Sequence, residues 1–531
     1  MLTQYIHNFI NNFDQKKTMD QLQSVASTKE GVIGLATAAL LMSTVAVYKS
    51  TRNDRGCPQV PNQSFLWGST PEYRKDPAAF IQKWEKELGP VYGAYLFGQY
   101  TTVVSGHQVR EIFLNDDFDF IAGIRRDFDT NLLANGGDLK DLPTHKFAGS
   151  IKKNLSPKLP FYTGRVIEHL KIGLKEFCGD VPDEGMEFDH VYPLVQHMVA
   201  KASASVFVGP ELAKNEQLID SFKNMVLEVG SELGPKPYLE FFPNLMRLRM
   251  WFIGKTSKKV KRHRDQLCAA LKPQVEYRLN AMKENDSNWD RPVSKGQDFL
   301  QDILESGDIP AHVDPTEHCC DWVTQIIFAA LHTTSENGTL SFYRLLDNPQ
   351  VLEDLMEEQN QVLEEAGYDK TVGPEVFTRE ILNKFVKMDS VIRETSRLRN
   401  DYIGLPHLNT SNKTITLSGG AMIHAGERAY VNFYSNHRDE NIQKMSDDLT
   451  TFKPYRFVNQ DKNSTKIGED FIFFGMGKHA CPGRWFAIQE IKTIIAMMIR
   501  SYQLSALGPV TFPTSDYSRI PYGRFKIVPR K

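Results

Sequence analysis

The chain has few cysteines: six in 531 residues, scattered without the paired spacing of a zinc site or a disulfide framework. The adjacent Cys319 and Cys320 follow His318. Neighbours on a helix point about 100° apart, so buried packing explains this trio better than a metal site does. The cysteine usage therefore indicates a reducing compartment and excludes a disulfide-stapled fold.

The chain also has no large excess of positive or negative charge. The 63 Lys and Arg residues nearly balance 65 Asp and Glu residues, for a formal net charge of −2. Such a chain has no global attraction to nucleic acid, which excludes that class of partner. No long linker and no internal repeat interrupts the sequence. With a hydrophobic content of 41%, we expect one large domain behind an N-terminal extension.

Long apolar runs are rare, and the exception is residues 31–48, "GVIGLATAALLMSTVAVY", which carry no charge. This length is at the short end of what spans a bilayer. Basic residues follow the run closely at Lys49, Arg52 and Arg55, so the positive-inside rule places the remainder in the cytoplasm. The polar residues before the run disfavour a cleaved signal peptide. A buried Ala-rich helix is the alternative interpretation.

These features predict four parts of the chain. They are a polar segment at 1–30, a transmembrane anchor at 31–48, a basic and proline-containing hinge at 49–62, and a catalytic domain at 63–531. Helical periodicity dominates the middle of the chain, and short strand-like runs cluster late, as in 413–433. The predicted fold is mainly α with a small β subdomain.

The stretch "FGMGKHACPG" at 474–483 places a cysteine in a glycine-rich loop. Its glycines allow a flat or bulky group to approach the backbone, and Pro482 predicts the first turn of a helix. Cys481 is then expected at a helix N-terminus, which lowers the pKa of a thiol. A thiolate there suits either a nucleophile with His479 as its base or a haem ligand shielded by Phe474.

The spacing of Phe474, Gly477, Cys481 and Gly483 resembles the haem-ligand signature of the cytochromes P450. Four fixed positions make a chance match rare. The resemblance implies haem b with Cys481 as the axial iron ligand, and it extends over roughly residues 57–531.

Two further segments resemble that family. Glu394 and Arg397 in "IRETSRLR" match its Glu-x-x-Arg motif. The stretch "FKPYRF" at 452–457 is similar to its Pro-x-Arg-Phe segment. In the family these segments form a buried charged cluster beneath the haem-binding loop. The resemblance therefore predicts that Arg456 contacts Glu394 and Arg397, in a structural role.

The segment "FAALHTTSE" at 328–336 resembles the family's oxygen-activating helix, with Thr333 at the catalytic threonine position. His332 stands where an acid is usual. An imidazole titrates near neutrality and can serve in a proton relay, while a helix histidine bonded to a neighbouring carbonyl is the alternative. His332 and Glu336 alone, without a third ligand, do not predict a metal site.

Haem carboxylates need cationic partners, and the resemblance points to His479 and to His407 in "GLPHLNT". The family's Trp-x-x-x-Arg helix is absent. The corresponding region at 144–155 offers His145 and Lys152 or Lys153 instead. Solvated surface side chains are the alternative interpretation for all of these residues.

The resemblance implies a monooxygenase that hydroxylates a lipophilic small molecule with O2, using electrons from NADPH through NADPH–cytochrome P450 reductase and, in some members, cytochrome b5. His-Thr-Thr resembles a fungal, ent-kaurene oxidase-like branch, which favours a terpenoid or steroid of secondary metabolism. The resemblance, with the predicted anchor, implies a single-pass protein of the endoplasmic reticulum membrane whose catalytic domain faces the cytoplasm. The alternatives are a P450-fold isomerase, dehydratase or peroxygenase without a reductase, and a non-enzymatic haem-binding protein.

Overall fold

A computed structural model describes residues 55–61, 67–134, 144–233, 243–285, 298–399, 402–513 and 520–530. The polar segment and the anchor predicted at 1–48 lie outside these residues. Within the described ranges, no helix combines the length and apolar character needed to cross a membrane.

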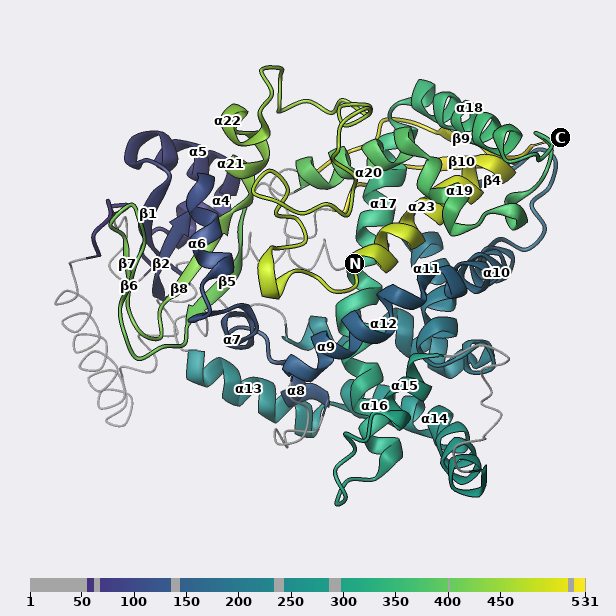
Figure 1. Cartoon of the computed structure of the whole chain (residues 1–531), viewed down its shortest axis with the longest axis horizontal. Coiled ribbons are helices and arrows are strands. Elements are labelled where there is room, and N and C mark those ends of the chain that lie inside the picture. Colours follow the sequence, from purple (N-terminus) through teal and green to yellow (C-terminus); the bar gives the residue numbers. More distant parts are fainter. Residues whose placement is uncertain are drawn as a thin grey trace, which may run out of the picture.

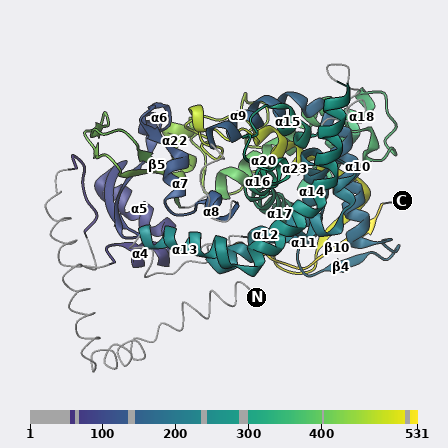
Figure 2. The ribbon, with the colours of Figure 1, turned by 90° about the horizontal axis from the view of Figure 1, so that it is seen from below.

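The described chain divides into a small region of sheet and a larger helical region, which lie side by side in two perpendicular views (Figures 1 and 2). The helices are α4 (Thr70–Lys75), α5 (Pro77–Leu88), α6 (Val109–Leu114), α7 (Phe120–Arg125), α8 (Thr130–Ala134), α9 (Thr144–Asn154), α10 (Leu159–Cys178), α11 (Tyr192–Phe207), α12 (Glu216–Leu233), α13 (Pro243–Thr256), α14 (Lys258–Asn285), α15 (Phe299–Glu305), α16 (Pro315–Ile326), α17 (His332–Leu346), α18 (Pro349–Glu365), α19 (Arg379–Lys384), α20 (Val386–Arg399), α21 (Phe433–Arg438), α22 (Glu440–Gln443) and α23 (Arg484–Ser501). Short 3₁₀ turns are η1 (Gly106–Gln108), η2 (Ser156–Lys158), η3 (Leu212–Lys214), η6 (Pro374–Val376) and η7 (Gly477–His479).

The main sheet has the strand order β1-β2-β8-β5-β3. Its strands are β1 (Val91–Leu96), β2 (Gln99–Val104), β3 (Phe118–Asp119), β5 (Ile403–Asn409) and β8 (Arg428–Asn432). A tight turn joins β1 to β2, because both Phe97 and Gly98 adopt positive φ, at 52° and 75°. Strands β2 and β8 run parallel, whereas the other pairs are antiparallel.

The described residues also form two smaller sheets. One has the order β4-β10-β9, and the other is a hairpin of β6 and β7. Their strands are β4 (Met186–Phe188), β6 (Ile415–Thr416), β7 (Met422–Ile423), β9 (Tyr502–Ala506) and β10 (Phe525–Pro529). The turn of the hairpin contains Gly420 at φ +86°, in the region where sequence indicated a tight turn. The prediction of a mainly α fold with a small β part is confirmed.

One long helix runs through the centre of the helical region and is labelled α16 and α17 in Figure 1. Asp314 caps its start by accepting hydrogen bonds from the backbone N–H groups of Thr316 and Glu317, and Pro315 occupies the first turn. Between α16 and α17 lies a π-turn, η5 (Ile327–Leu331), so the segment 315–346 is continuous. π-turns inside α-helices frequently occur at functional sites.

The largest hydrophobic cluster surrounds this central helix. It draws buried side chains from α10, α11, α12, α14 and α23, among them Tyr162, Met198 and Phe222. A second cluster joins α18, α19, α20 and α23. The C-terminal helix α23 contributes to both clusters and therefore fixes the loop that precedes it, residues 474–483, against the core.

Candidate active site

The cysteine loop, residues 474–483, is closed by a hydrogen bond of 2.8 Å from the backbone N–H of Cys481 to the carbonyl of Phe474. Gly477 has φ +60°, and a Cβ at this position would lie 2.9 Å from the carbonyl oxygen of Phe113. Glycine is therefore required both by the left-handed conformation and by the close approach to α6. These two features explain the motif's fixed glycine in physical terms.

The Cys481 sulfur lies at the start of α23, where the backbone N–H groups of Gly483 and Arg484 donate hydrogen bonds to it. This confirms the predicted helix N-terminal setting, although α23 begins at Arg484, two residues after Pro482. The expectation of a lowered thiol pKa is wrong for the protein alone. Burial raises the pKa of Cys481, and this effect outweighs the two amides and the Arg484 charge.

A buried thiol with a raised pKa is a poor nucleophile unless a base serves it. The contacts described for His479 do not include the Cys481 sulfur; its Nε2 lies 3.2 Å from the carbonyl oxygen of Phe118. A metal ion, in contrast, deprotonates a coordinating thiol outright. The loop geometry therefore favours the ligand interpretation of Cys481 over the nucleophile interpretation.

A cavity of about 1000 Å³ lies beside the cysteine loop, at the upper end of the sizes typical of organic ligand sites. It is formed by segments far apart in sequence. From the loop and α23 come Gly477, Lys478, His479, Ala480, Pro482, Arg484 and Trp485; the other walls come from 119–131, 148–152, Arg247, Leu408 and Ile467.

Cationic side chains gather around this cavity. They are Arg125, Lys152, Arg247, Lys478 and Arg484, against two carboxylates, Asp119 and Asp129. Arg125 has a buried Nη2 without a hydrogen-bond partner among the described residues, and its Nε is 4.0 Å from Asp129. An unpaired buried guanidinium nitrogen is costly unless an anionic group completes it. These residues therefore fit a group that carries carboxylates, as the propionates of haem do.

The histidines that the sequence predicted as propionate partners, His407 and His479, do not supply positive charge near pH 7. His407 is fully buried on β5, its Nδ1 lies 2.7 Å from the carbonyl oxygen of Leu405, and its Nε2 has no partner in the described chain. Burial lowers the pKa of His407 to about 4, so the ring is neutral near pH 7 and carries no positive charge. Burial also lowers the pKa of His479, whose ring lies 5.7 Å from that of His407.

The region of the missing Trp-x-x-x-Arg motif forms α9. Lys152 lines the cavity, whereas Lys153 is not among the lining residues. The side chain of His145 lies outside the described part of the chain. Sequence reasoning missed Arg125 and Arg247; the only sequence signal was a pair of arginines in "GIRRDF", since the cavity itself forms only in the fold.

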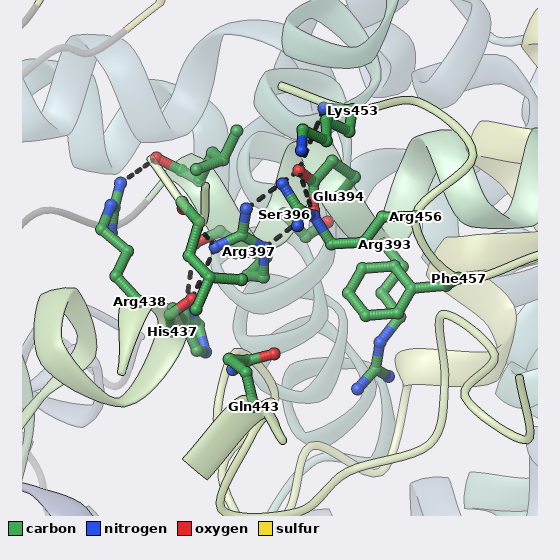
Figure 3. A network of polar contacts seen from close by, with 12 residues as sticks. Arg393, Glu394, Ser396, Arg397, His437, Arg438, Gln443, Lys453, Arg456 and Phe457 are labelled. Atoms are coloured by element: carbon green, nitrogen blue, oxygen red, sulfur yellow. Dashed lines mark hydrogen bonds and ion pairs between the residues drawn. The ribbon is translucent and has the colours of Figure 1, made fainter. Parts of the chain in front are cut away.

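Glu394, Arg397 and Arg456 form a charged cluster in which Glu394 pairs with both arginines (Figure 3). Arg397 binds both carboxylate oxygens of Glu394, at 2.7 and 2.9 Å, and Arg456 binds one of them at 2.9 Å. Glu394 and Arg397 are fully buried. Other guanidinium N–H groups of the two arginines donate to the Asp447 carboxylate and to backbone carbonyls, so the cluster joins α20 to α21 and to the segment 447–456. The carbonyls are those of His437, Leu449, Asp448 and Thr451.

Two further buried side chains connect this cluster toward the cysteine loop. His437 has its Nδ1 2.9 Å from the carbonyl oxygen of Arg397 and accepts a hydrogen bond from the backbone N–H of Ile472. Arg393 donates to the carbonyls of Asn463 and Lys466, and it stacks on Phe471 at 4.1 Å. Through these contacts α20 holds the chain just before residue 474.

Thr333 is exposed, although the helix around it is largely buried. Its hydroxyl donates to the carbonyl of Ala329, one turn earlier in the π-turn, and Ala329 is exposed as well. His332 instead bonds two side chains, Tyr192 and Glu336, each at 2.9 Å. The alternative of a histidine bonded to a neighbouring carbonyl is thus not what the structure contains.

Fold and site together define a class: a mainly helical protein with a glycine-rich cysteine loop and a cation-lined cavity suited to haem. The model of the family described as Cytochrome P450 matches residues 58–521, so the chain belongs to the cytochrome P450 family. It is a cytochrome P450 monooxygenase, and membership implies haem and, in general, a redox partner.

The two relatives compared with this chain are fungal monooxygenases. The chain is 25% identical to cytochrome P450 monooxygenase 151 of Postia placenta, over 84% of this chain and 86% of that protein. It is 29% identical to monooxygenase BOA4 of Botryotinia fuckeliana, over 60% and 61%. Among solved structures, retinoic acid-bound cyanobacterial CYP120A1 matches with a TM-score of 0.62 at 19% identity, covering 89% of this chain and 100% of that one, which shows the shared fold.

Proposed function

We propose that this chain is a membrane-anchored haem-thiolate monooxygenase that hydroxylates a terpenoid or steroid, with electrons from NADPH delivered by a membrane-bound NADPH–cytochrome P450 reductase. The observation that carries the haem assignment is the pair of backbone amides directed at the Cys481 sulfur. Such donors stabilise a ligating thiolate and tune its iron.

In this proposal Cys481 ligates the haem iron, and Gly477 and Gly483 keep the loop close to the ring. Arg125 and Lys152 bind the propionates, with neutral His479 as a hydrogen-bonding neighbour. Haem held by a thiolate supplies the oxidising chemistry that inserts one oxygen atom of O2 into a C–H bond while the other leaves as water. The chain itself binds the haem and the substrate, orients the substrate and supplies protons.

A lipophilic substrate is supported by aromatic and apolar side chains that the fold brings together from distant segments. Phe128, from the segment 118–128, packs against Phe328 of the central helix at 5.8 Å between ring centroids. The backbone N–H of Asp129 contacts Met250 Sδ at 3.5 Å, which brings α13 to the same place. Apolar and aromatic walls bind apolar molecules of corresponding size. The choice of terpenoid or steroid rests on the His-Thr-Thr likeness.

Localisation at the endoplasmic reticulum membrane is part of the proposal, with 31–48 as the anchor and 63–531 as the catalytic domain on the cytoplasmic side. One feature of the described chain supports contact with a bilayer. Helix α13 exposes Leu245, Leu248, Trp251 and Phe252. The same helix carries Arg247, Arg249 and Lys255, so its surface offers apolar side chains for acyl chains and cations for anionic headgroups.

The first test is the carbon monoxide difference spectrum of the reduced protein, wild type beside Cys481→Ser. We expect the red-shifted Soret band of a thiolate ligand in the wild type and its loss in the variant. Folded wild-type protein without haem would contradict the ligand assignment.

The second test separates the monooxygenase from its alternatives. With reductase and NADPH, a panel of terpenoids and steroids is screened for hydroxylated product and for stimulated NADPH consumption. Product from an organic hydroperoxide, but none with reductase and NADPH, would instead identify a peroxygenase or isomerase. If addition of cytochrome b5 reproducibly raises the turnover rate, cytochrome b5 is a partner as well.

A further inference from the structure

One amide side chain, that of Asn131, reaches the cavity with a hydrogen-bond donor still unused. Asn131 lines the cavity from α8, although only 4% of the residue is exposed. Its Oδ1 accepts a hydrogen bond of 3.1 Å from Nε2 of Gln325, and its backbone N–H donates to Oδ1 of Asp129 at 3.2 Å. Within the described chain its Nδ2 has no partner. Nδ2 is therefore the polar atom that Asn131 presents to the cavity.

The orientation of this amide is fixed by its neighbours. The hydroxyl of Thr130 donates to Oε1 of Gln325 at 2.6 Å, so the other end of the Gln325 amide is the donor that meets Asn131. This donation holds Oδ1 of Asn131 toward the central helix. The N–H groups of the Asn131 side chain consequently point away from that helix's amide and remain available to a ligand.

The segment that carries Asn131 packs against apolar side chains. Phe128, three residues earlier, lies 5.8 Å from Phe328 of the central helix between ring centroids. Met250 of α13 contacts the backbone N–H of Asp129 through Sδ. The donor therefore stands beside the aromatic wall that suits a lipophilic molecule.

A donor in such a wall discriminates between ligands. An apolar molecule that covers Nδ2 strips water from it and returns no hydrogen bond, so it carries the full desolvation penalty of the group. A molecule with an oxygen atom at the same place restores the bond. Sites built to hydrogen-bond a ligand reject analogues that lack the matching atom.

We propose that Asn131 is a specificity-determining residue, which donates a hydrogen bond from Nδ2 to a hydroxyl or carbonyl oxygen that the substrate already carries, and that Gln325 is its positioning residue. The proposal rests on the monooxygenase function above and narrows its substrate to an already oxygenated lipophilic molecule. A hydrocarbon terpene would leave the amide unpaired. A reaction that adds oxygen, or one that retains the oxygen of a precursor, must therefore supply the substrate.

The test uses the haem-loaded full chain and probes that bind without knowledge of the substrate. 1-Alkylimidazoles coordinate haem iron and shift its Soret band, so a titration gives their Kd. A series of graded chain length is prepared with a methyl, a hydroxyl or a methyl ketone at the far end. At the length that reaches Asn131, the wild type should bind the ketone probe about tenfold more tightly than the methyl probe.

Three substitutions test the assignment. Asn131→Leu should lose the preference for both oxygenated probes. Asn131→Asp keeps the shape but has no donor, so it should lose the ketone preference and keep that for the hydroxyl, which can donate. Gln325→Leu should weaken the preference while the methyl probe binds as in the wild type. Gln489→Leu is the control, because this buried amide donates to Thr163, outside the cavity lining, and should keep the wild-type preference.

The carbon monoxide band of each variant confirms folded, haem-loaded protein. Equal ketone and methyl affinities in the wild type at every chain length would overturn the proposal, and so would a preference unchanged in both Asn131 variants. A lower haem-to-protein ratio in Asn131→Leu, with the preference intact in the protein that retains haem, would place the amide at the haem and overturn it too. A wild-type Soret band that responds to no imidazole would overturn the haem assignment itself, so the two failures are distinguishable.

Discussion

Glu490 shows at the scale of one residue how burial decides protonation. Its side chain is buried on α23, where Oε1 accepts a hydrogen bond from Ser203 and Oε2 has no partner among the described residues. Burial raises the pKa of Glu490 from 4.5 to about 8. The folded protein therefore keeps this carboxyl protonated at pH 7, while the unfolded chain ionises it.

This difference predicts a stability change with pH. Between pH 4.5 and 8 the unfolded state loses a proton that the folded state retains, so the contribution of Glu490 to the free energy of unfolding is greatest below pH 4.5. It falls by about 1.4 kcal/mol per pH unit as pH rises to 8. Glu490→Gln removes this dependence and should be more stable than the wild type at pH 8, with a smaller advantage at pH 5.

Urea unfolding of both proteins at pH 5, 6.5 and 8 measures this effect. Glu353→Gln is the control, because Glu353 is exposed on α18. A Glu490→Gln variant whose stability follows the wild type in parallel at all three values would show that the carboxyl is already ionised in the folded protein.

The cysteine illustrates which residue properties a sequence can predict. The helix N-terminal position of Cys481 follows from the local pattern of glycine and proline, and the structure contains it. The direction of the thiol pKa does not follow, because burial arises from packing of distant segments. Arg125 was missed for the same reason, because its unpaired nitrogen points to a ligand site only beside a cavity whose wall comes from six separate stretches of chain.

Helix α20 is the element that connects the charged cluster with the central helix. Glu394 and Arg397 hold the segment 447–456, and Arg399 at the last turn binds Glu336 and Asn337 of α17. Motif spacing predicted the first set of contacts. It could not predict the contacts of Arg393 and His437, whose partners are mostly backbone carbonyl and amide groups of loops that only the fold brings near.

Removing one partner from such a buried pair is costly. Glu394→Gln leaves the buried Arg397 without its carboxylate and Arg456 with Asp447 alone. We expect a loss of about 3–5 kcal/mol in the free energy of unfolding. Because the same helix holds the chain before residue 474, haem content should fall as well. Denaturation and the haem-to-protein ratio measure the two effects.

Glu375→Gln is the control for this prediction. Its ion pair with Lys171 is half exposed, with 57% and 40% of the two side chains accessible, and should contribute less than about 1 kcal/mol. Equal losses for Glu394→Gln and Glu375→Gln would contradict a special role of the buried cluster.

In the folded molecule, the helix with exposed apolar side chains, α13, lies beside the wall of the cavity. Helix α13 lies next to α8 (Figures 1 and 2). From it, Arg247 lines the cavity and lies 3.6 Å from Asp129, while Leu248 and Phe252 are each 58% exposed. If this face contacts a bilayer, a lipophilic substrate can pass from lipid toward the cavity without crossing water.

This arrangement predicts the depth of Trp251 in a membrane. In vesicles containing brominated lipids, full-length protein should show quenching of Trp251 fluorescence, obtained by subtracting the Trp251→Phe variant. Each buried Leu or Phe contributes about 1.5–3 kcal/mol, so Leu248→Glu with Phe252→Glu should abolish most of the quenching. Phe161→Glu, on the exposed face of α10, is the control and should leave it unchanged. Membrane-bound protein without any Trp251 quenching would show that α13 faces away from the bilayer, and the substrate would then have to enter through water.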